Sequence, residues 1–233
     1  MPEYADVADG LTMPLEDAMR TQRAVRRLRS DPVDDDTLLT VVELATKAPT
    51  GSNQQGWEFV AVRDPDVKHA LARLNRQAWS IYRRFASAQA RGDLAAARML
   101  AAVQYQADHF EDAPVIVVAC LHGRPLPSSM GKAAYYGSVF PAVQNLLLAA
   151  RGLGLGATLT TLPLWSRNQA RRTLGLPRNV TPCAVIPLGW PQKGGYGPTT
   201  RRPVREVLHL DRYGNQPFLD GAESTADQAS ERR

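Results

Sequence analysis

Apolar residues recur along the chain with two different spacings, one typical of helices and one typical of strands. After the acidic run 34–36, apolar residues return at helical spacing, which predicts a helix that begins at this run. Residues 57–63 alternate as a half-buried strand does, whereas 113–121 (APVIVVACL) are almost continuously apolar and β-branched. The second pattern predicts a central strand that is covered on both faces.

The same patterns predict the remaining elements. The expected helices are 14–23, a long helix from 64–66 past Trp79 and Tyr82, 95–110, 132–151 and 166–174, and the further expected strands are 157–162 and 183–189. Gly92 lies in a plausible break at 89–93, and Pro141 implies a kink or a shortened start in the helix 132–151. Roughly four or five strands and roughly six helices without regular βαβ alternation favour an α+β fold.

The string GLGLGA at 152–157 matches the glycine pattern of dinucleotide-binding loops. Such a loop must follow a strand and open a helix, so that the helix N-terminus meets the pyrophosphate. Here a long helix precedes the glycines and a strand follows them. We therefore interpret them as a helix C-cap and a tight reversal into a buried strand.

Composition narrows the class of protein. The chain has 233 residues and no run of about 18 apolar residues, so no membrane span is predicted. Its first residues are acidic and lack the pattern of an export signal. Cys120 and Cys183 lie in apolar, strand-like stretches without metal-type spacing, as buried free thiols do. We expect a cytoplasmic protein.

Positive charge is unevenly distributed. Five arginines fall between positions 20 and 29, and Arg201, Arg202 and Arg205 form a second group. Nucleic acid, a phosphate-bearing small molecule or a solvated face could each explain these clusters. The first cluster has no interleaved aromatic residues, and no nucleic-acid-reading module accompanies it, so nucleic acid is the least favoured partner.

The segment 45–62 (ATKAPTGSNQQGWEFVAV) carries the strongest functional signal. The turn within it, between a predicted helix end and a predicted strand, carries Thr50, Ser52, Asn53, Gln54 and Gln55. This turn presents many hydrogen-bonding groups and no charge, which suits a flat heterocycle with a polar edge. An ordinary polar loop is the alternative. Arg23 and Arg26 are three positions apart, so a persisting helical turn would let both guanidinium groups share one phosphate. A solvated basic helix end is the alternative there.

Together these segments resemble the FMN-dependent nitroreductase family, in particular its mycobacterial-type members. Ala48–Trp57 (APTGSNQQGW) resembles the family stretch that borders the flavin ring, with Gly56 before the tryptophan in place of the more usual proline. Arg23-Ala24-Val25-Arg26 resembles the family's Arg-Ser-x-Arg phosphate motif, with Ala24 in place of the serine. The resemblance spans roughly residues 14–214, which we expect to form one domain, with flexible termini at 1–13 and 221–233.

The resemblance implies both a fold and a set of site residues. The fold is α+β, with a central, mostly antiparallel sheet flanked by helices and a C-terminal arm exchanged in a homodimer. Arg23, Arg26 and the pair Arg201/Arg202 are expected to reach the phosphate, and residues 160–162 to pass the flavin ring. The predicted cofactor-binding residues are Arg23, Ala24, Arg26, Pro49, Thr50, Ser52, Asn53, Gln55, Thr160, Thr161, Leu162, Arg201 and Arg202. Two threonines in a strand are also simply β-formers, and Asn145, which matches a family string, is better interpreted as a packing residue.

The implied function is ping-pong oxidoreduction. NADH or NADPH reduces FMN, and an aromatic acceptor such as a nitroaromatic, a quinone or another conjugated electrophile then takes the electrons. No protein acid, base or nucleophile is expected, since the four histidines are scattered and the cofactor supplies the chemistry. The segment 76–110, with Trp79, Tyr82, Phe85 and Tyr105, is the candidate cover of the acceptor pocket. These aromatic residues could equally be core residues at helical spacing, and for most of them core is the favoured interpretation. Two alternatives stay open: a flavin-sequestering protein without turnover, and a reductase linked to the deazaflavin F420.

Overall fold

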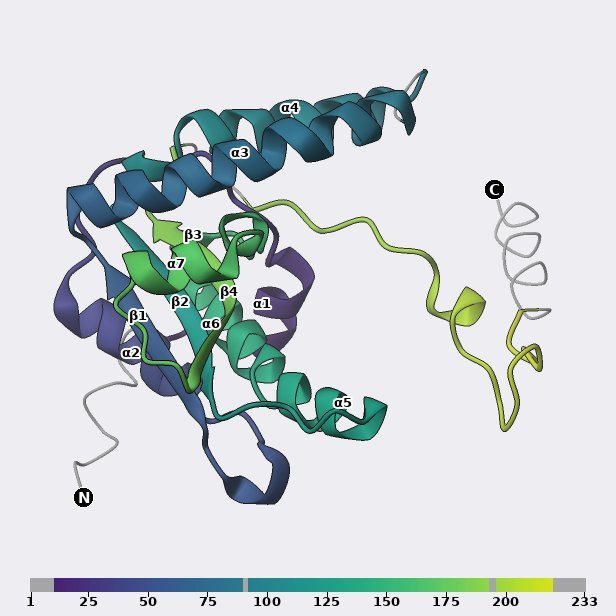
Figure 1. Ribbon diagram of the computed structural model, residues 1–233. Helices are drawn as coiled ribbons and strands as arrows, with labels where there is room; N and C mark the ends of the chain where they lie inside the picture. Colours follow the sequence, from purple (N-terminus) through teal and green to yellow (C-terminus); the bar gives the residue numbers. More distant parts are fainter. Residues whose placement is uncertain (1–10, 90–91, 193–195, 220–233) are drawn as a thin grey trace. The chain divides into compact units, whose positions relative to one another are not determined.

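A four-stranded antiparallel sheet lies at the centre of the protein (Figure 1). The computed structural model describes residues 11–89, 92–192 and 196–219. The strands are β1 (Trp57–Val62), β2 (Val115–His122), β3 (Gly156–Ala157) and β4 (Val180–Gly189), in the spatial order β1-β2-β4-β3. All three strand pairings are antiparallel, which confirms the predicted α+β class and its antiparallel sheet.

Seven α-helices accompany the sheet in the part of the chain that the structure describes. In chain order they are α1 (Leu15–Thr21), α2 (Asp35–Ala45), α3 (Pro65–Gln89), α4 (Leu94–Asp108), α5 (Ser129–Gly137), α6 (Phe140–Gly152) and α7 (Arg167–Thr173). Short 3-10 turns are η2 (Gly51–Asn53), η3 (Phe110–Asp112), η4 (Leu162–Leu164) and η5 (Val204–Glu206). The acidic start predicted for α2 is confirmed, since the Asp34 carboxylate accepts a hydrogen bond from the Thr37 N–H at 2.7 Å.

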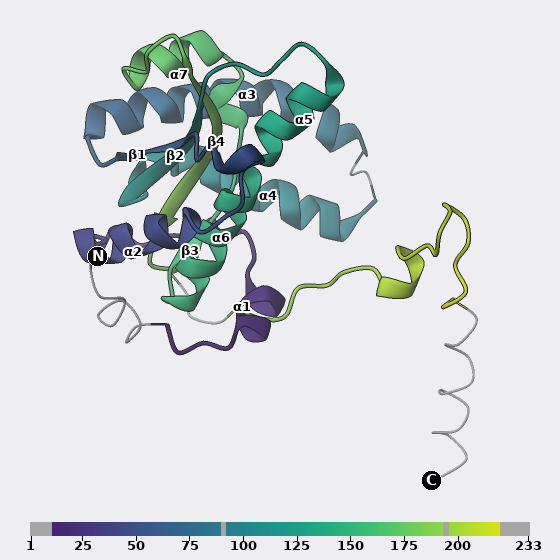
Figure 2. The same ribbon diagram turned by 90° about the horizontal axis from the view of Figure 1, so that it is seen from below.

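The sheet separates two hydrophobic cores, because successive side chains of β2 point to opposite faces. Val115, Val117 and Ala119 pack with α2 and α6, whereas Ile116 and Val118 pack with residues of α3 and with the segments on either side of α7. Figure 2 shows these two helix layers on opposite sides of the sheet. The continuous apolar run of β2 is thereby explained, as both of its faces are fully covered.

Two predicted elements were wrong in extent. The single helix predicted at 132–151 is two helices, α5 and α6, that are separated at Ser138-Val139. Pro141 has no N–H to donate and fits only the first turn of a helix, so α6 begins beside it. The continuous strand predicted at 157–162 ends at Ala157, because Pro187 lies opposite Thr158 and has no N–H to complete that pair. The pairing resumes only as an isolated bridge between Thr160 and Val185.

The interpretation of the glycine string as a cap and reversal is confirmed. Helix α6 ends at Gly152, Gly154 adopts a φ of +78°, and the Leu155 N–H donates to the Ala150 carbonyl at 2.8 Å. Gly156 then enters β3, where an added Cβ would lie 2.7 Å from Cγ1 of Val25. The string therefore turns the chain into the sheet and opens no helix.

The chain divides into two units, Met1–Gly197 and Pro198–Arg233. The second unit contains η5 and a turn in which the Leu210 N–H donates to the Asn215 carbonyl at 2.8 Å. The exchange of this arm in a dimer and the single domain 14–214 stay predictions. The flexible termini predicted at 1–13 and 221–233 lie outside the described residues, apart from 11–13. None of the helices that the structure describes combines the length and the apolar composition that crossing a bilayer requires.

Candidate cofactor site

The arginine motif lies on an extended segment, so the helical turn that would have aligned Arg23 and Arg26 does not persist beyond α1. Helix α1 ends at Thr21, and Ala24 then forms a parallel bridge with Ala157 at the edge of the sheet. The Val25 N–H donates to the Ala157 carbonyl at 3.0 Å. The backbone N–H and C=O groups of this segment need hydrogen-bond partners, which a longer α1 would have supplied. The edge of the sheet, which is distant in sequence, supplies a partner instead, so the segment is extended.

Arg23 and Arg26 nevertheless line the same cavity, which has a volume of about 260 Å³. Its other lining residues are Ala24, Val25, Arg27, Ala102, Pro191 and Tyr196. Among the described residues, none of those that line it is acidic. The cavity therefore collects positive charge from three neighbouring guanidinium groups without a carboxylate to balance it.

Arg26 is the most informative side chain of this cavity. Its Nε is buried and has no hydrogen-bond partner among the described residues. Burial, and to a lesser extent the charge of Arg23, lowers the pKa of Arg26 below its ordinary value. A buried donor without a partner is rare in folded proteins, and Arg23 and Arg26 repel each other, so both features favour an anion beside these two arginines. Arg26 also lines a smaller neighbouring cavity of about 30 Å³, which Asp112 lines as well.

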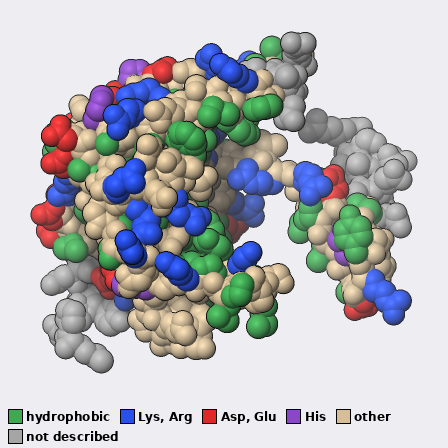
Figure 3. Space-filling model, viewed as in Figure 1, with side chains coloured by type: hydrophobic (Ala, Val, Ile, Leu, Met, Phe, Trp, Pro, Cys, Tyr) green, Lys and Arg blue, Asp and Glu red, His purple; other side chains and the backbone are tan. Residues whose placement is uncertain are grey.

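Positive charge alone would not mark this place. Figure 3 shows Lys and Arg side chains over much of the viewed face. Arg172 on α7, for example, is exposed and does not line the cavity. What distinguishes the cavity is the combination of converging arginines with a buried, unpaired guanidinium nitrogen.

Thr158 supports the arginine segment and was missed from the sequence. Its side chain is buried, and its Oγ1 donates to the Val25 carbonyl at 2.7 Å. This bond and the bridge at Ala157 together fix the backbone between Arg23 and Arg26. The available signal was a threonine directly after the glycine string, at the point where the chain enters the sheet.

The uncharged loop 49–55 lines a second cavity, of about 320 Å³. Thr50 and Ser52 line it, together with residues of α5, whereas Pro49, Asn53 and Gln55 do not appear among its described lining residues. The Gly51 N–H donates to Ser138 Oγ at 3.3 Å, which ties the loop to the end of α5; Figure 2 shows the two side by side.

The backbone of this loop is strained. Ser52, Asn53 and Gln55 have φ values of 52°, 51° and 49°, in the left-handed region that residues with a Cβ rarely adopt. The Gln55 N–H donates to Thr50 Oγ1 at 3.0 Å, and this bond holds the conformation. Strained, exposed, uncharged loops of this kind are concentrated at ligand sites.

The approach of residues 160–162 to the flavin ring stays a prediction. Thr160 exchanges backbone hydrogen bonds with Val185, both at 2.9 Å, and its Oγ1 accepts from the Leu162 N–H at 3.3 Å. Within the described residues, Thr160, Thr161 and Leu162 line neither of the two cavities. Arg201 and Arg202 belong to the second unit, and their reach to a phosphate stays a prediction.

The aromatic residues of α3 and α4 divide into two groups. Trp79 is buried, and its Nε1 donates to Gln104 Oε1 at 2.8 Å, as expected for a core residue. Tyr82 and Phe85 are 55% and 70% exposed, so the core interpretation does not hold for these two, and they stay candidates for the cover of an acceptor pocket. Helices α3 and α4 form a hairpin, and these two side chains lie where it offers no partner surface to cover them.

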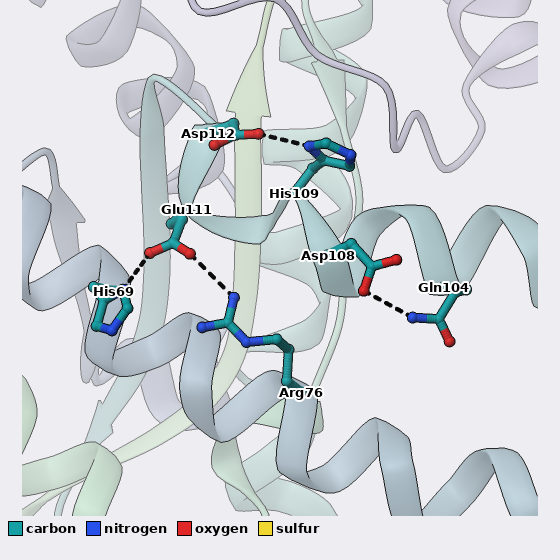
Figure 4. Close-up of polar contacts among 7 residues, drawn as sticks. All are labelled: His69, Arg76, Gln104, Asp108, His109, Glu111 and Asp112. Carbon is teal, nitrogen blue, oxygen red and sulfur yellow. Dashed lines mark hydrogen bonds and ion pairs between the residues drawn. The ribbon is translucent and has the colours of Figure 1, made fainter.

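Polar contacts join the hairpin to the turn η3, as Figure 4 shows. Glu111 accepts from His69 Nδ1 at 2.6 Å and from Arg76 at 3.1 Å. Burial raises the pKa of Glu111, but the hydrogen bonds from Arg76 and His69 outweigh it and hold that pKa below its ordinary value. These contacts are structural, and no cluster of three potential metal ligands occurs among the described residues.

Asn145 and the two cysteines behave as packing residues. Asn145 Nδ2 donates to the Leu44 carbonyl at 3.4 Å, between α6 and α2, as the packing interpretation predicts. Cys120 and Cys183 are free and buried, which confirms the expected state of both thiols.

Comparison with known proteins assigns the fold and its site to a family. The sequence profile of the nitroreductase family matches residues 19–190. The chain belongs to the nitroreductase family. The match covers the arginine motif, the uncharged loop and the whole sheet, and as a member of this family the chain is an oxidoreductase.

Similar proteins carry several activities in their names. The chain is 27% identical to an iodotyrosine deiodinase from Nematostella vectensis over 83% of its own length and 73% of that protein's. It is 28% identical to an NADH dehydrogenase from Thermus thermophilus, with 84% and 97% covered. The chain spans 62% to 73% of the length of the deiodinases it matches.

The fold is shared with solved structures. The NADPH:FMN oxidoreductase from Vibrio harveyi, complexed with NAD+, superposes with a TM-score of 0.65 and 21% identity, and 93% of this chain and 84% of that one are covered. At this identity the likeness shows the fold alone.

Proposed function

We propose that this protein is an FMN-dependent oxidoreductase that takes a hydride from NADH or NADPH and reduces a conjugated aromatic acceptor in a ping-pong cycle. The observation that carries the proposal is the cavity of Arg23 and Arg26, with its buried, unpaired guanidinium nitrogen, in a member of the nitroreductase family. Bound FMN supplies the redox chemistry, and the protein supplies position and charge.

The residues of the first cavity suit the phosphate of FMN. Arg23 and Arg26 would hold it by charge-assisted hydrogen bonds, and this binding would relieve the repulsion between the two cations. Ala24 offers no hydroxyl at this place, so the arginines and the backbone carry the contact. Arg201 and Arg202 are proposed as further phosphate ligands, on the resemblance of their segment to the family's.

The residues of the second cavity suit the ring. Thr50 and Ser52 line this cavity and present hydroxyl groups that would orient a heterocycle through its polar edge. Pro49, Asn53 and Gln55, on the same uncharged loop, are proposed to border the ring on the resemblance of their segment to the family's. Thr160, Thr161 and Leu162 are proposed to pass the same ring through their backbone. The loop 49–55 itself brings no charge to the ring, and Arg124 is the charged arginine among the lining residues of this cavity.

We further propose a homodimer in which the loop of one chain borders the flavin of its partner. The two cavities share no lining residue within the described chain, as expected if each serves a different flavin. A separate apolar cavity on α1 and α6 supports a dimer, since Leu15 and Met19 are 64% and 57% exposed beside it. Two free, buried thiols support a reducing, cytoplasmic location.

The test is the absorbance spectrum of the purified protein before and after NADPH or NADH is added without oxygen. Flavin bands that bleach with either nucleotide and return with a nitroaromatic or a quinone are the expected result. A colourless protein that takes up no added FMN would refute the proposal. Retained FMN that neither nucleotide reduces would favour flavin sequestration, and reduction by reduced F420 alone would favour the F420-linked alternative.

Reductive dehalogenation is a second candidate, favoured by the relatives that are named iodotyrosine deiodinases. In that case two electrons and a proton replace the iodine of an iodinated phenol by hydrogen and release iodide. The reduced protein, mixed without oxygen with 3-iodotyrosine and separately with a nitroaromatic, distinguishes the candidates by which compound restores the oxidised spectrum.

A further inference from the structure

Arg27 is the third arginine that lines the first cavity, beside Arg23 and Arg26. The resemblance to the family gives it no role. Its guanidinium carbon lies 3.8 Å from the centre of the Tyr105 ring. No hydrogen bond or ion pair of its side chain occurs among the described residues. The side chain is nevertheless held in one place, because a cation is attracted to the face of an aromatic ring.

The position of the Arg27 guanidinium over the Tyr105 ring leaves its N–H donors available to a ligand. A guanidinium group that lies over a ring uses its flat face for that contact, while its N–H groups point outward in its own plane. Arg27 lines the same cavity as Arg23 and Arg26, so these donors are available to an anion there. A carboxylate would hold the cation but would also neutralise its charge. The ring holds the cation and leaves its charge available to an anion.

Tyr105 is itself held by contacts from three segments. Gln192 Nε2 donates to the Tyr105 hydroxyl at 3.0 Å and to the Leu28 carbonyl at 3.1 Å. The Gln192 N–H donates to the Arg27 carbonyl at 2.9 Å, so one residue ties both the ring and the backbone of the arginine segment. His109 stacks on Tyr105 with a centroid distance of 4.3 Å.

His109 is fixed in turn by Asp112, whose carboxylate pairs with its Nδ1 at 2.8 Å (Figure 4). Helix α4, the turn η3, the end of β4 and the arginine segment therefore meet at Tyr105. Such a connected set restricts the rotamers of Arg27 before any ligand arrives, which reduces the entropy lost on binding.

We propose that Arg27 is a third phosphate ligand of the cofactor, and that Tyr105 and Gln192 are positioning residues that hold it ready. This inference rests on the proposed function, since it assigns the ligand as FMN. It also accounts for Ala24: a guanidinium from Arg27 supplies donors where the family's serine would supply a hydroxyl.

The test compares the affinity of the full-length protein, stripped of flavin, for FMN and for riboflavin, which lacks the phosphate. Arg27→Ala is expected to weaken FMN binding about 10-fold or more, as expected for a lost hydrogen bond to a charged group, and riboflavin binding less than about 2-fold. Arg29→Ala is the matched control, because Arg29 pairs with Asp31 at 3.4 Å and does not line the cavity.

Variants of Tyr105 separate positioning from general stability. Tyr105→Leu removes the ring face and is expected to weaken FMN about 3-fold or more without a matching loss for riboflavin. Tyr105→Phe keeps the face and loses only the hydroxyl, so FMN affinity is expected to stay closer to that of the wild type. A merely structural role would weaken both flavins equally in Tyr105→Leu, and that result would overturn the positioning role.

The outcomes also separate this inference from the proposed function. If the wild-type protein prefers FMN to riboflavin and Arg23→Ala abolishes the preference while Arg27→Ala matches Arg29→Ala, the role of Arg27 is overturned and the proposed function stands. If the folded wild-type protein binds neither flavin, both are overturned. Loss of the preference in both Arg23→Ala and Arg27→Ala supports both.

Discussion

Replacing Arg26 by methionine is expected to make the flavin-free protein more stable and the flavin-bound protein less so. Methionine keeps the aliphatic stem of the side chain but removes the buried Nε, which has no partner among the described residues, and the repulsion by Arg23. An unsatisfied buried donor costs about 1–3 kcal/mol, so a gain of about 1 kcal/mol in the free energy of unfolding is expected. For a chain of this length that corresponds to a rise of about 2–4 °C in Tm.

FMN is expected to reverse the order. At a concentration of about 100 times its Kd, FMN stabilises the wild-type protein by about 2.7 kcal/mol. Loss of one hydrogen bond to a charged group costs about 1.5–3 kcal/mol, which raises the Kd at least about 10-fold. At the same FMN concentration the variant then gains about 1.4 kcal/mol or less. The variant is more stable than the wild type without FMN, but FMN stabilises it less. The smaller stabilisation by FMN offsets or exceeds the stability that the substitution adds.

The assay is thermal unfolding with and without FMN at fixed protein and salt concentrations. Arg172→Met on α7 is the control, since Arg172 is exposed and lines neither cavity, and it should shift neither transition. A variant Arg26→Met that melts below the wild type without FMN, and shows the full shift with it, would refute the reasoning. It would mean that the buried nitrogen is satisfied in solution and that the phosphate binds elsewhere.

Three further outcomes are expected. Gly189→Ala should lower Tm, because its Cβ would lie 2.6 Å from Pro114 Cδ and overpacking costs about 1–3 kcal/mol; an unchanged Tm would mean that the proline ring moves freely. Burial raises the pKa of Cys120 to about 12 and that of Cys183 to about 11, so neither thiol should react with a thiol reagent at about pH 8 until the protein unfolds. Hydrogen bonds from Thr37 lower the pKa of Asp34 below its ordinary value of 3.8, so Asp34→Ala should lower Tm at neutral pH. The loss of Tm should shrink as the pH falls through the lowered pKa, because the protonated carboxyl no longer caps the helix as a charged acceptor. A loss of Tm that does not depend on pH would exclude the cap as its cause.

Local patterns in the sequence determined the sheet and most helices. The apolar run of β2, the acidic start of α2 and the glycine reversal after α6 each depend on neighbours in the chain, because backbone propensity and side-chain periodicity act over a few residues. The resemblance to the nitroreductase family also rests on short strings, and the family match bears it out. The break between α5 and α6 was signalled only in part, by Pro141.

The environment of each site residue was decided by contacts between distant segments. The edge of β3 holds Arg23–Arg26 in an extended segment, and α4 and the segment after β4 supply Tyr105 and Gln192 around it. The burial of Arg26, the support from Thr158 and the exposure of Phe85 have no local signature. Sequence patterns encode which backbone form a segment prefers, whereas burial and charge environment arise only when remote segments pack together.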